Sequence, residues 1–118
     1  GYMIQGGGMP PEKTPRPTRA PIPNEAANGL QTRRGSVAMA RTADPHSATA
    51  QFYINTVDNP LLDHRAPTGQ GWGYCVFGRV VSGMEVVAAI ESVATGRRGG
   101  RGDVPETPVV IQKALLEP

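Results

Sequence analysis

The side chains best suited to catalysis are two histidines, each beside a residue type that often partners histidine in active sites. His46 precedes Ser47, and His64 follows Asp63. Adjacency in sequence does not make a catalytic triad, and the chain has no nucleophile-elbow motif. Two histidines without an HExxH-type pair or a cysteine cluster also make a weak metal site. We therefore expect both histidines to lie in solvated loops, with no serine hydrolase site and no bound metal.

Two glycine-rich segments have compositions that occur in nucleotide or nucleic-acid sites. Residues 6–8 are three consecutive glycines, but they lack the lysine and Ser/Thr of a phosphate-binding loop. They predict a turn with close backbone packing. Residues 97–102 resemble a short RGG patch of the kind that binds RNA. The patch has no aromatic neighbours and the net charge is only +2, so we expect a flexible, solvated loop. RNA binding stays open as an alternative that steeply salt-dependent affinity would reveal.

The remaining candidates suit hydrogen bonding beside an apolar pocket rather than acid–base chemistry. They are Tyr2, Met3, Gln5, Gln51, Tyr53, Leu61, Leu62 and Tyr74. They form no ionisable pair, and taken singly each is more often a core or surface residue than a site residue. The residue types alone therefore leave a binding module and an enzyme without ionic catalysis both open.

The elements that position these residues must be short and rich in β-structure. The 118 residues include 15 glycines and 12 prolines, and frequent chain breakers favour many turns over a helical bundle. This length suits one domain, and 38% apolar and 19% charged residues are typical of a globular protein. The single cysteine, Cys75, excludes an internal disulfide and is expected to be a small core residue. No apolar run reaches the about 18 residues of a membrane span.

The expected elements follow from local residue patterns. Alternating and β-branched residues predict strands at residues 2–5, 36–41, 51–56, 74–81 and 109–116. The spacing of Met84, Val87 and Glu91 after Ser82-Gly83 predicts one helix over residues 83–93. Proline and glycine in residues 9–30 and 57–73 predict irregular loops without a helix longer than one turn. Residues 95–103 form a further predicted loop. There is no βαβ alternation, and one domain covers residues 1–118.

Longer strings in the chain resemble those of cyclophilins. Residues 2–8, Tyr-Met-Ile-Gln-Gly-Gly-Gly, are similar to the stretch that follows this family's catalytic arginine. Residues 35–41 and 47–55 look like the family's signature region. Residues 61–63, 74–78 and 83–86 continue the resemblance in the same order, and residues 71–75 are similar to bacterial members in particular. The resemblance covers essentially all 118 residues.

The resemblance implies a mainly β fold: a cyclophilin-like closed antiparallel barrel of eight strands with capping helices. It also implies that the first strands, the first helix and the catalytic arginine lie upstream of Gly1, so that the domain over residues 1–118 is incomplete at its N-terminus. On this expectation no residue of the chain takes the arginine's role, and the 118 residues alone would be inactive. Arg41 corresponds to a position that contacts the peptide backbone.

The implied activity is peptidyl-prolyl cis-trans isomerisation during protein folding, with no cofactor and no metal. Tyr2, Met3, Tyr53 and Leu62 would line the proline pocket, with Leu61 at its rim. Gln5 would hydrogen-bond the substrate backbone and help orient the arginine, as a supporting catalytic residue. Ala40, Arg41 and Gln51 would bind the residues before proline, and Tyr74 would lie at the pocket edge. The alternative is a proline-segment binding protein, or holdase, that does not catalyse.

Three substitutions relative to the family affect the expected pocket and partners. Tyr2 and Tyr53 stand where phenylalanine is common, and a hydroxyl buried without a partner is costly, so either the hydroxyls reach water or the pocket is more polar than usual. Leu61 replaces a tryptophan of many eukaryotic members, which predicts weak cyclosporin binding. The expected partners are proline-containing peptides and unfolded clients, not nucleic acid or membranes. We expect the full-length form to be a cytoplasmic monomer, with the periplasm as the alternative location.

Overall fold

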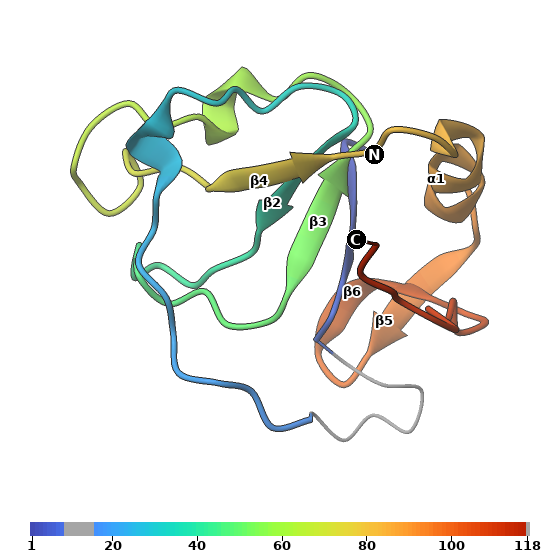
Figure 1. The fold of residues 1–118 in the computed structure, drawn as a ribbon. Helices are drawn as coiled ribbons and strands as arrows, with labels where there is room; N and C mark the ends of the chain where they lie inside the picture. Colours follow the sequence, from blue (N-terminus) through green and yellow to red (C-terminus); the bar gives the residue numbers. More distant parts are fainter. Residues whose placement is uncertain (9–15, 118) are drawn as a thin grey trace.

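The computed structural model describes residues 1–8 and 16–117, and an antiparallel sheet of four strands dominates these residues. The strands are β1 (Met3–Gly6), β2 (Ser36–Met39), β3 (Phe52–Asn55) and β4 (Val76–Arg79). They lie side by side in the order β1-β3-β2-β4 (Figure 1). The strands predicted at residues 2–5, 36–41, 51–56 and 74–81 are thus confirmed, with shorter or slightly shifted bounds.

One row of side chains crosses all four strands. Gln5 pairs with Tyr53, Tyr53 with Ala38, and Ala38 with Val76. Residues paired directly across antiparallel strands share one face of the sheet. Ala38, Tyr53 and Val76 are buried and form the core cluster. Packed against this cluster are Met3, Ala40, Leu62 and Tyr74. The core therefore supports several of the residues that the sequence suggested for a pocket.

Asn55 joins β3 to its surroundings through a fully buried side chain. Its Nδ2 donates to Ser36 Oγ at 2.9 Å, and its Oδ1 accepts from Asn59 Nδ2 at 2.7 Å. Removing one member of a buried hydrogen-bond network costs about 1–3 kcal/mol. We therefore expect Asn55→Ala to lower the free energy of unfolding by about 2 kcal/mol in urea denaturation.

The matched control for Asn55 is Asn28, whose exposed side chain accepts one backbone hydrogen bond from Leu30. Asn28→Ala should cost less than about 1 kcal/mol, because water can replace that bond. Equal losses in the two variants would contradict the buried network at Asn55.

The predicted helix is confirmed as α1 (Met84–Glu91), which follows Gly83 with its φ of 96°. The helix packs against β1, and Val87 is its buried residue. The Thr56 hydroxyl, just after β3, donates to the Glu91 carboxylate at the end of the helix. These contacts hold α1 beside the sheet rather than over its centre (Figure 1).

The segment predicted as a loop at residues 95–103 is a β-hairpin. Strand β5 (Thr95–Arg98) pairs antiparallel with β6 (Arg101–Pro105). The connecting Gly99 and Gly100 have φ values of 57° and 79°, the left-handed conformation that a tight hairpin turn requires and that glycine adopts readily. The loop prediction was wrong because Gly-Gly here makes a turn between two paired strands.

The predicted strand at residues 109–116 is also wrong, since these residues are exposed and form no strand. A strand needs a hydrogen-bonded neighbour, and no described strand pairs with this segment. For the same reason the described residues do not form the expected closed eight-stranded barrel. Strands β1 and β4 are the outer strands of an open sheet, and β5 and β6 make a separate one (Figure 1).

Where residues 16–30 and 57–73 are described, the long connections contain no regular helix longer than one turn, as predicted. Their described parts contain single 3₁₀ turns at Ala26–Asn28 and Pro60–Leu62. Residues 9–15 of the first connection lie outside the described residues. Within residues 1–8 and 16–117, no helix has the length and apolar character to cross a membrane.

Candidate functional site

A groove of about 110 Å³ lies where the sheet meets the connections on either side of it. It is lined by Tyr2, Met3, Gln5, Ala40, Arg41, Tyr53, Leu62 and Tyr74. These residues come from β1 and the residue before it, the two residues after β2, the middle of β3, the turn at Pro60–Leu62 and the segment before β4. Five separate stretches of the sequence therefore build one concave surface.

The alternation of side chains along a strand explains why Met3, Gln5 and Tyr53 lie on the same face of the sheet. Successive side chains on a strand point to opposite faces, so Met3 and Gln5 share a face of β1, and the Gln5–Tyr53 pairing places both on the same face of the sheet. Gln5 Nε2 donates to Gln51 Oε1 at 2.9 Å. This bond orients both amide side chains beside the groove.

Aromatic and cationic side chains stack along one side of the groove. The Tyr53 and Tyr74 rings meet edge to face, with centroids 5.7 Å apart. The Arg41 guanidinium carbon lies 4.9 Å from the Tyr74 ring centroid, a cation–π distance. Arg41 Nη2 also donates to the Gly69 carbonyl at 2.8 Å. Arg41 and Tyr74 are half-buried, and the Tyr74 ring contacts both the buried Tyr53 and the Arg41 guanidinium.

Gly73 makes the turn that brings Leu62 and Tyr74 together. Its φ is 68°, and a Cβ at this position would lie 2.5 Å from the Leu62 carbonyl oxygen. The Tyr74 backbone N–H donates to the same oxygen at 2.9 Å, and the Gly73 carbonyl accepts from buried Asn24 Nδ2 at 3.1 Å. This role of Gly73 was not predicted from the sequence, although a glycine one residue before Tyr74 is a signal for such a turn.

The two histidines lie in loops, as expected, but they pack on Trp72 rather than extending freely into solvent. Their ring centroids are 5.0 Å and 5.1 Å from that of Trp72, both edge to face. His46 Nδ1 accepts from the Asn24 backbone N–H at 3.0 Å, and His64 Nδ1 lies 3.0 Å from the Trp72 carbonyl oxygen. Neither histidine lines the groove. Their contacts stabilise the loops that carry it.

Eight of the ten proposed substrate-binding residues line the groove. Gln51 joins them through its hydrogen bond to Gln5. Leu61 does not line it, and its side chain is 77% exposed. The two tyrosines that replace phenylalanine differ, since Tyr2 is 53% exposed whereas Tyr53 is 2% exposed. The geometry thus gathers the suggested residues, while their roles toward a substrate stay predictions.

Two polar atoms of the groove residues are buried without a hydrogen-bond partner in the described part of the chain: Tyr53 Oη and Arg41 Nε. Burial is the main reason why the pKa of the Tyr53 phenol is raised, and the neighbouring Tyr74 adds to the effect. The Tyr53 hydroxyl therefore stays protonated at neutral pH and can donate a hydrogen bond.

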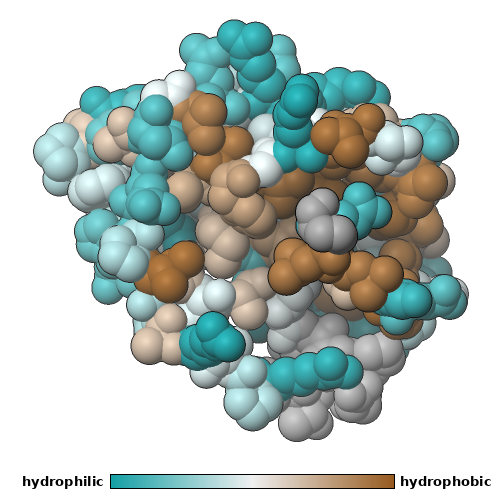
Figure 2. All heavy atoms as spheres, viewed as in Figure 1, coloured by the Kyte–Doolittle hydropathy of each residue, from teal (hydrophilic) through white to brown (hydrophobic). Residues whose placement is uncertain are grey.

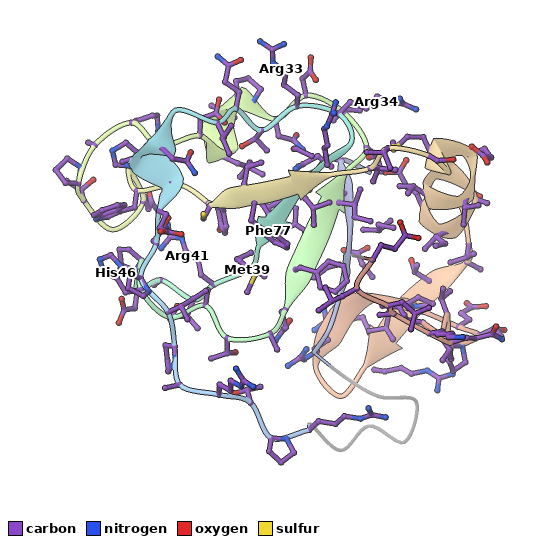
Figure 3. All side chains as sticks on the ribbon, viewed as in Figure 1. Arg33, Arg34, Met39, Arg41, His46 and Phe77 are labelled. Carbon is purple, nitrogen blue, oxygen red and sulfur yellow. The ribbon has the colours of Figure 1, made fainter. Side chains whose placement is uncertain are left out.

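A second cavity, of about 280 Å³, lies on the other side of Arg41. Its lining includes Met39 and Phe77 from β2 and β4, both labelled in Figure 3. Ile22 and Pro23 also line it. In the same view, hydrophobic side chains gather most densely to the right, on the side of α1 and the β5–β6 hairpin (Figure 2). Cys75 lines this cavity and is half-buried rather than a core residue. The described residues contain no group of three or more His, Cys, Asp or Glu side chains placed to hold a metal.

The fold and the groove together define a β-rich protein whose groove combines apolar side chains with hydrogen-bond donors and has no acid–base pair among its lining residues. Residues 1–115 match the family of cyclophilin-type peptidyl-prolyl cis-trans isomerases. The chain belongs to this family.

Bacterial relatives match nearly the whole chain. It is 57% identical over 116 residues to peptidyl-prolyl cis-trans isomerase B of Escherichia coli, covering 98% of this chain and 71% of that protein. A peptidyl-prolyl cis-trans isomerase of Streptomyces antibioticus is 58% identical over 115 residues, with 98% and 69% covered. Peptidyl-prolyl cis-trans isomerase A of Dickeya dadantii is 49% identical over 117 residues, with 98% and 60% covered. The resemblance to cyclophilins is thereby confirmed.

Proposed function

We propose that this protein accelerates rotation about X-Pro peptide bonds and that the groove between β1, β3 and Tyr74 holds the proline. The observation that carries this proposal is the gathering of Met3, Gln5, Tyr53 and Leu62 on one groove in a chain of the cyclophilin family. The substrates are proline-containing segments of peptides and unfolded proteins.

The chemistry fits a groove without a nucleophile or metal. Rotation about an amide has a barrier of about 18–20 kcal/mol, because resonance gives the C–N bond partial double-bond character. No covalent bond breaks, so catalysis requires a site that holds the proline ring and stabilises the twisted amide better than the planar one. Apolar side chains serve the first requirement, and oriented hydrogen-bond donors serve the second.

The roles follow from the position of each side chain. Met3, Tyr53 and Leu62 would contact the proline ring, with Tyr2 and exposed Leu61 at the rim. Gln5, held by Gln51, would hydrogen-bond the peptide backbone. Ala40 and Arg41 would contact the residues before proline, and Tyr74 would close the edge. That the family's catalytic arginine precedes Gly1 stays a prediction, and we assign its role to no described residue.

Substitution of Gln5 tests the groove. A single peptide hydrogen bond contributes about 1 kcal/mol, so Gln5→Ala should weaken binding of the peptide Ala-Ala-Pro-Phe about fivefold. The cis-trans exchange rate at subsaturating enzyme should fall by a similar factor. Titration calorimetry and exchange NMR measure the two quantities.

Gln31 offers a matched control, because it is exposed and bonds only to Arg33 outside the groove. Gln31→Ala should leave binding and exchange unchanged. A Gln5→Ala variant that binds and catalyses like the unsubstituted protein would remove Gln5 from the site. Tight peptide binding without any acceleration of exchange would instead favour the alternative, a proline-segment binding protein or holdase.

Finer features of the family are proposed on resemblance alone. The open sheet would form part of a closed eight-stranded barrel with capping helices, in which the outer edges of β1 and β4 find partners. Cyclosporin would bind weakly, because Leu61 offers no indole. A chaperone role toward unfolded clients, a monomeric full-length form and a cytoplasmic location stay predictions.

A further inference from the structure

Three buried side-chain polar atoms of the described residues lack a hydrogen-bond partner, and two of them belong to residues that line the groove. These are Tyr53 Oη and Arg41 Nε, whereas the third, Thr32 Oγ1, belongs to a residue outside the groove lining. Buried donors normally have partners, because an unpaired one forfeits its hydrogen bonds to water. Two unpaired donors at one groove therefore require an explanation.

Packing does not supply that explanation. Tyr53 lies in the core cluster with Ala38 and Val76, where a phenylalanine would fill the same space without an unsatisfied hydroxyl. Arg41 is held by its stacking on Tyr74 and by the hydrogen bond from Nη2 to Gly69. These contacts fix the direction of the remaining Nε–H without satisfying it. Both groups are donors, since a guanidinium has no acceptor and the buried phenol keeps its proton.

We propose that Tyr53 Oη and Arg41 Nε are specificity-determining donors that bind backbone carbonyl oxygens of the peptide next to the proline. This inference rests on the proposed function and deepens it. The proline ring itself offers no acceptor, whereas the carbonyl groups on either side of it do. A bound peptide thus supplies what both donors lack, and a ligand with an apolar ring but no carbonyl leaves them unpaired.

The present packing also indicates how the carbonyl reaches Tyr53. The side chain is 2% exposed, and the Tyr74 ring lies edge-on against it with Arg41 stacked on Tyr74. Tyr74 and Arg41 are both half-buried and line the groove. Peptide binding therefore shifts the Arg41–Tyr74 pair outward, which opens access to the hydroxyl.

Tyr53→Phe tests the proposal, because it removes the hydroxyl alone. The proposal predicts opposite signs for two measurements: the melting temperature of the free protein rises, and the affinity for Ala-Ala-Pro-Phe falls about fivefold. A hydroxyl that is only buried and unpaired, with no role in binding, would on removal raise the melting temperature and leave affinity unchanged or improved, and that result overturns the proposal. Tyr2→Phe is the stability control. The Tyr2 side chain is 53% exposed, so removal of its hydroxyl should leave the melting temperature of the protein unchanged.

A second variant and a second peptide complete the test. Arg41→Lys keeps the charge but removes the Nε–H donor, so it should also weaken Ala-Ala-Pro-Phe binding several-fold. Affinity unchanged in this variant overturns the role of Arg41. The second peptide, Ala-Glu-Pro-Phe, adds a side-chain carboxylate before the proline. If Tyr53→Phe and Arg41→Lys weaken binding of this peptide but not of Ala-Ala-Pro-Phe, the acceptor is the carboxylate and the backbone assignment is wrong. Absence of binding of either peptide to the unsubstituted protein would refute the proposed function, and this proposal with it.

Discussion

Gly73→Ala is expected to lower the free energy of unfolding by about 3 kcal/mol, the largest single-residue loss of stability that we predict. Two effects add at this residue. The φ of 68° is strained for any residue with a Cβ, and the new Cβ would lie 2.5–2.6 Å from Leu62 and Asp63 backbone atoms. Backbone atoms cannot rotate aside as a side chain can. Urea denaturation followed by far-UV circular dichroism measures the loss.

Gly29 separates the two effects. Its φ is 87°, but no atom lies within 4 Å of a Cβ built on it. Gly29→Ala therefore carries the conformational strain alone and should cost about 1 kcal/mol. If Gly73→Ala costs no more than Gly29→Ala, the turn relaxes around the new methyl group, and the close approach between residues 62 and 73 does not constrain the groove.

The strands of the sheet could be predicted from the sequence because their signal is local. Residues 51–56 combine aromatic and β-branched residues in alternation, and the structure has β3 at Phe52–Asn55. The alternation also determines which side chains share a face, so the meeting of Met3, Gln5 and Tyr53 follows once β1 pairs with β3. That pairing joins segments about fifty residues apart, and only the family resemblance suggested it.

Other features depend on contacts that local patterns do not contain. Residues 109–116 have the composition of a strand, but no neighbouring edge pairs with them in the described structure. The hairpin of β5 and β6 was missed for the opposite reason, since its glycine- and arginine-rich strands have little β-propensity and depend on the Gly99-Gly100 turn. The packing of both histidines on Trp72 likewise depends on tertiary structure.

The hydroxyls of Tyr2 and Tyr53 differ in burial. The sequence allowed either a hydroxyl that reaches water or a pocket more polar than usual. Tyr2 is exposed, as the first expectation requires, whereas the Tyr53 hydroxyl is buried without a hydrogen-bond partner in the described part of the chain and meets neither expectation. Burial depends on what packs against a residue. The ring of Tyr74, which precedes β4, lies against Tyr53, and Arg41, which follows β2, stacks on Tyr74. No pattern around residue 53 contains that information.

Tyr74→Ala is expected to have the largest effect on the groove. The ring contacts Tyr53 edge to face and supports the Arg41 guanidinium, so its removal releases Arg41 and uncovers Tyr53 in one step. Aromatic and cation–π contacts each contribute about 0.5–1.5 kcal/mol, and the ring also forms part of the groove wall. We expect the affinity for Ala-Ala-Pro-Phe to fall at least about tenfold, which corresponds to about 1.4 kcal/mol. Titration calorimetry measures this loss.

Tyr74→Phe is the matched control, because it keeps the ring and both stacking contacts and removes only the hydroxyl. Among the described residues, no side-chain polar atom bonds to that hydroxyl, so this variant should retain peptide affinity within about twofold. Comparable losses of peptide affinity in the two variants would show that the Tyr74 hydroxyl, not the ring, is responsible, and would contradict the stacking role. Full affinity in Tyr74→Ala would show that Arg41 and Tyr53 hold their positions without the ring between them, and the groove would then need only its apolar floor of Met3 and Leu62 to bind the peptide.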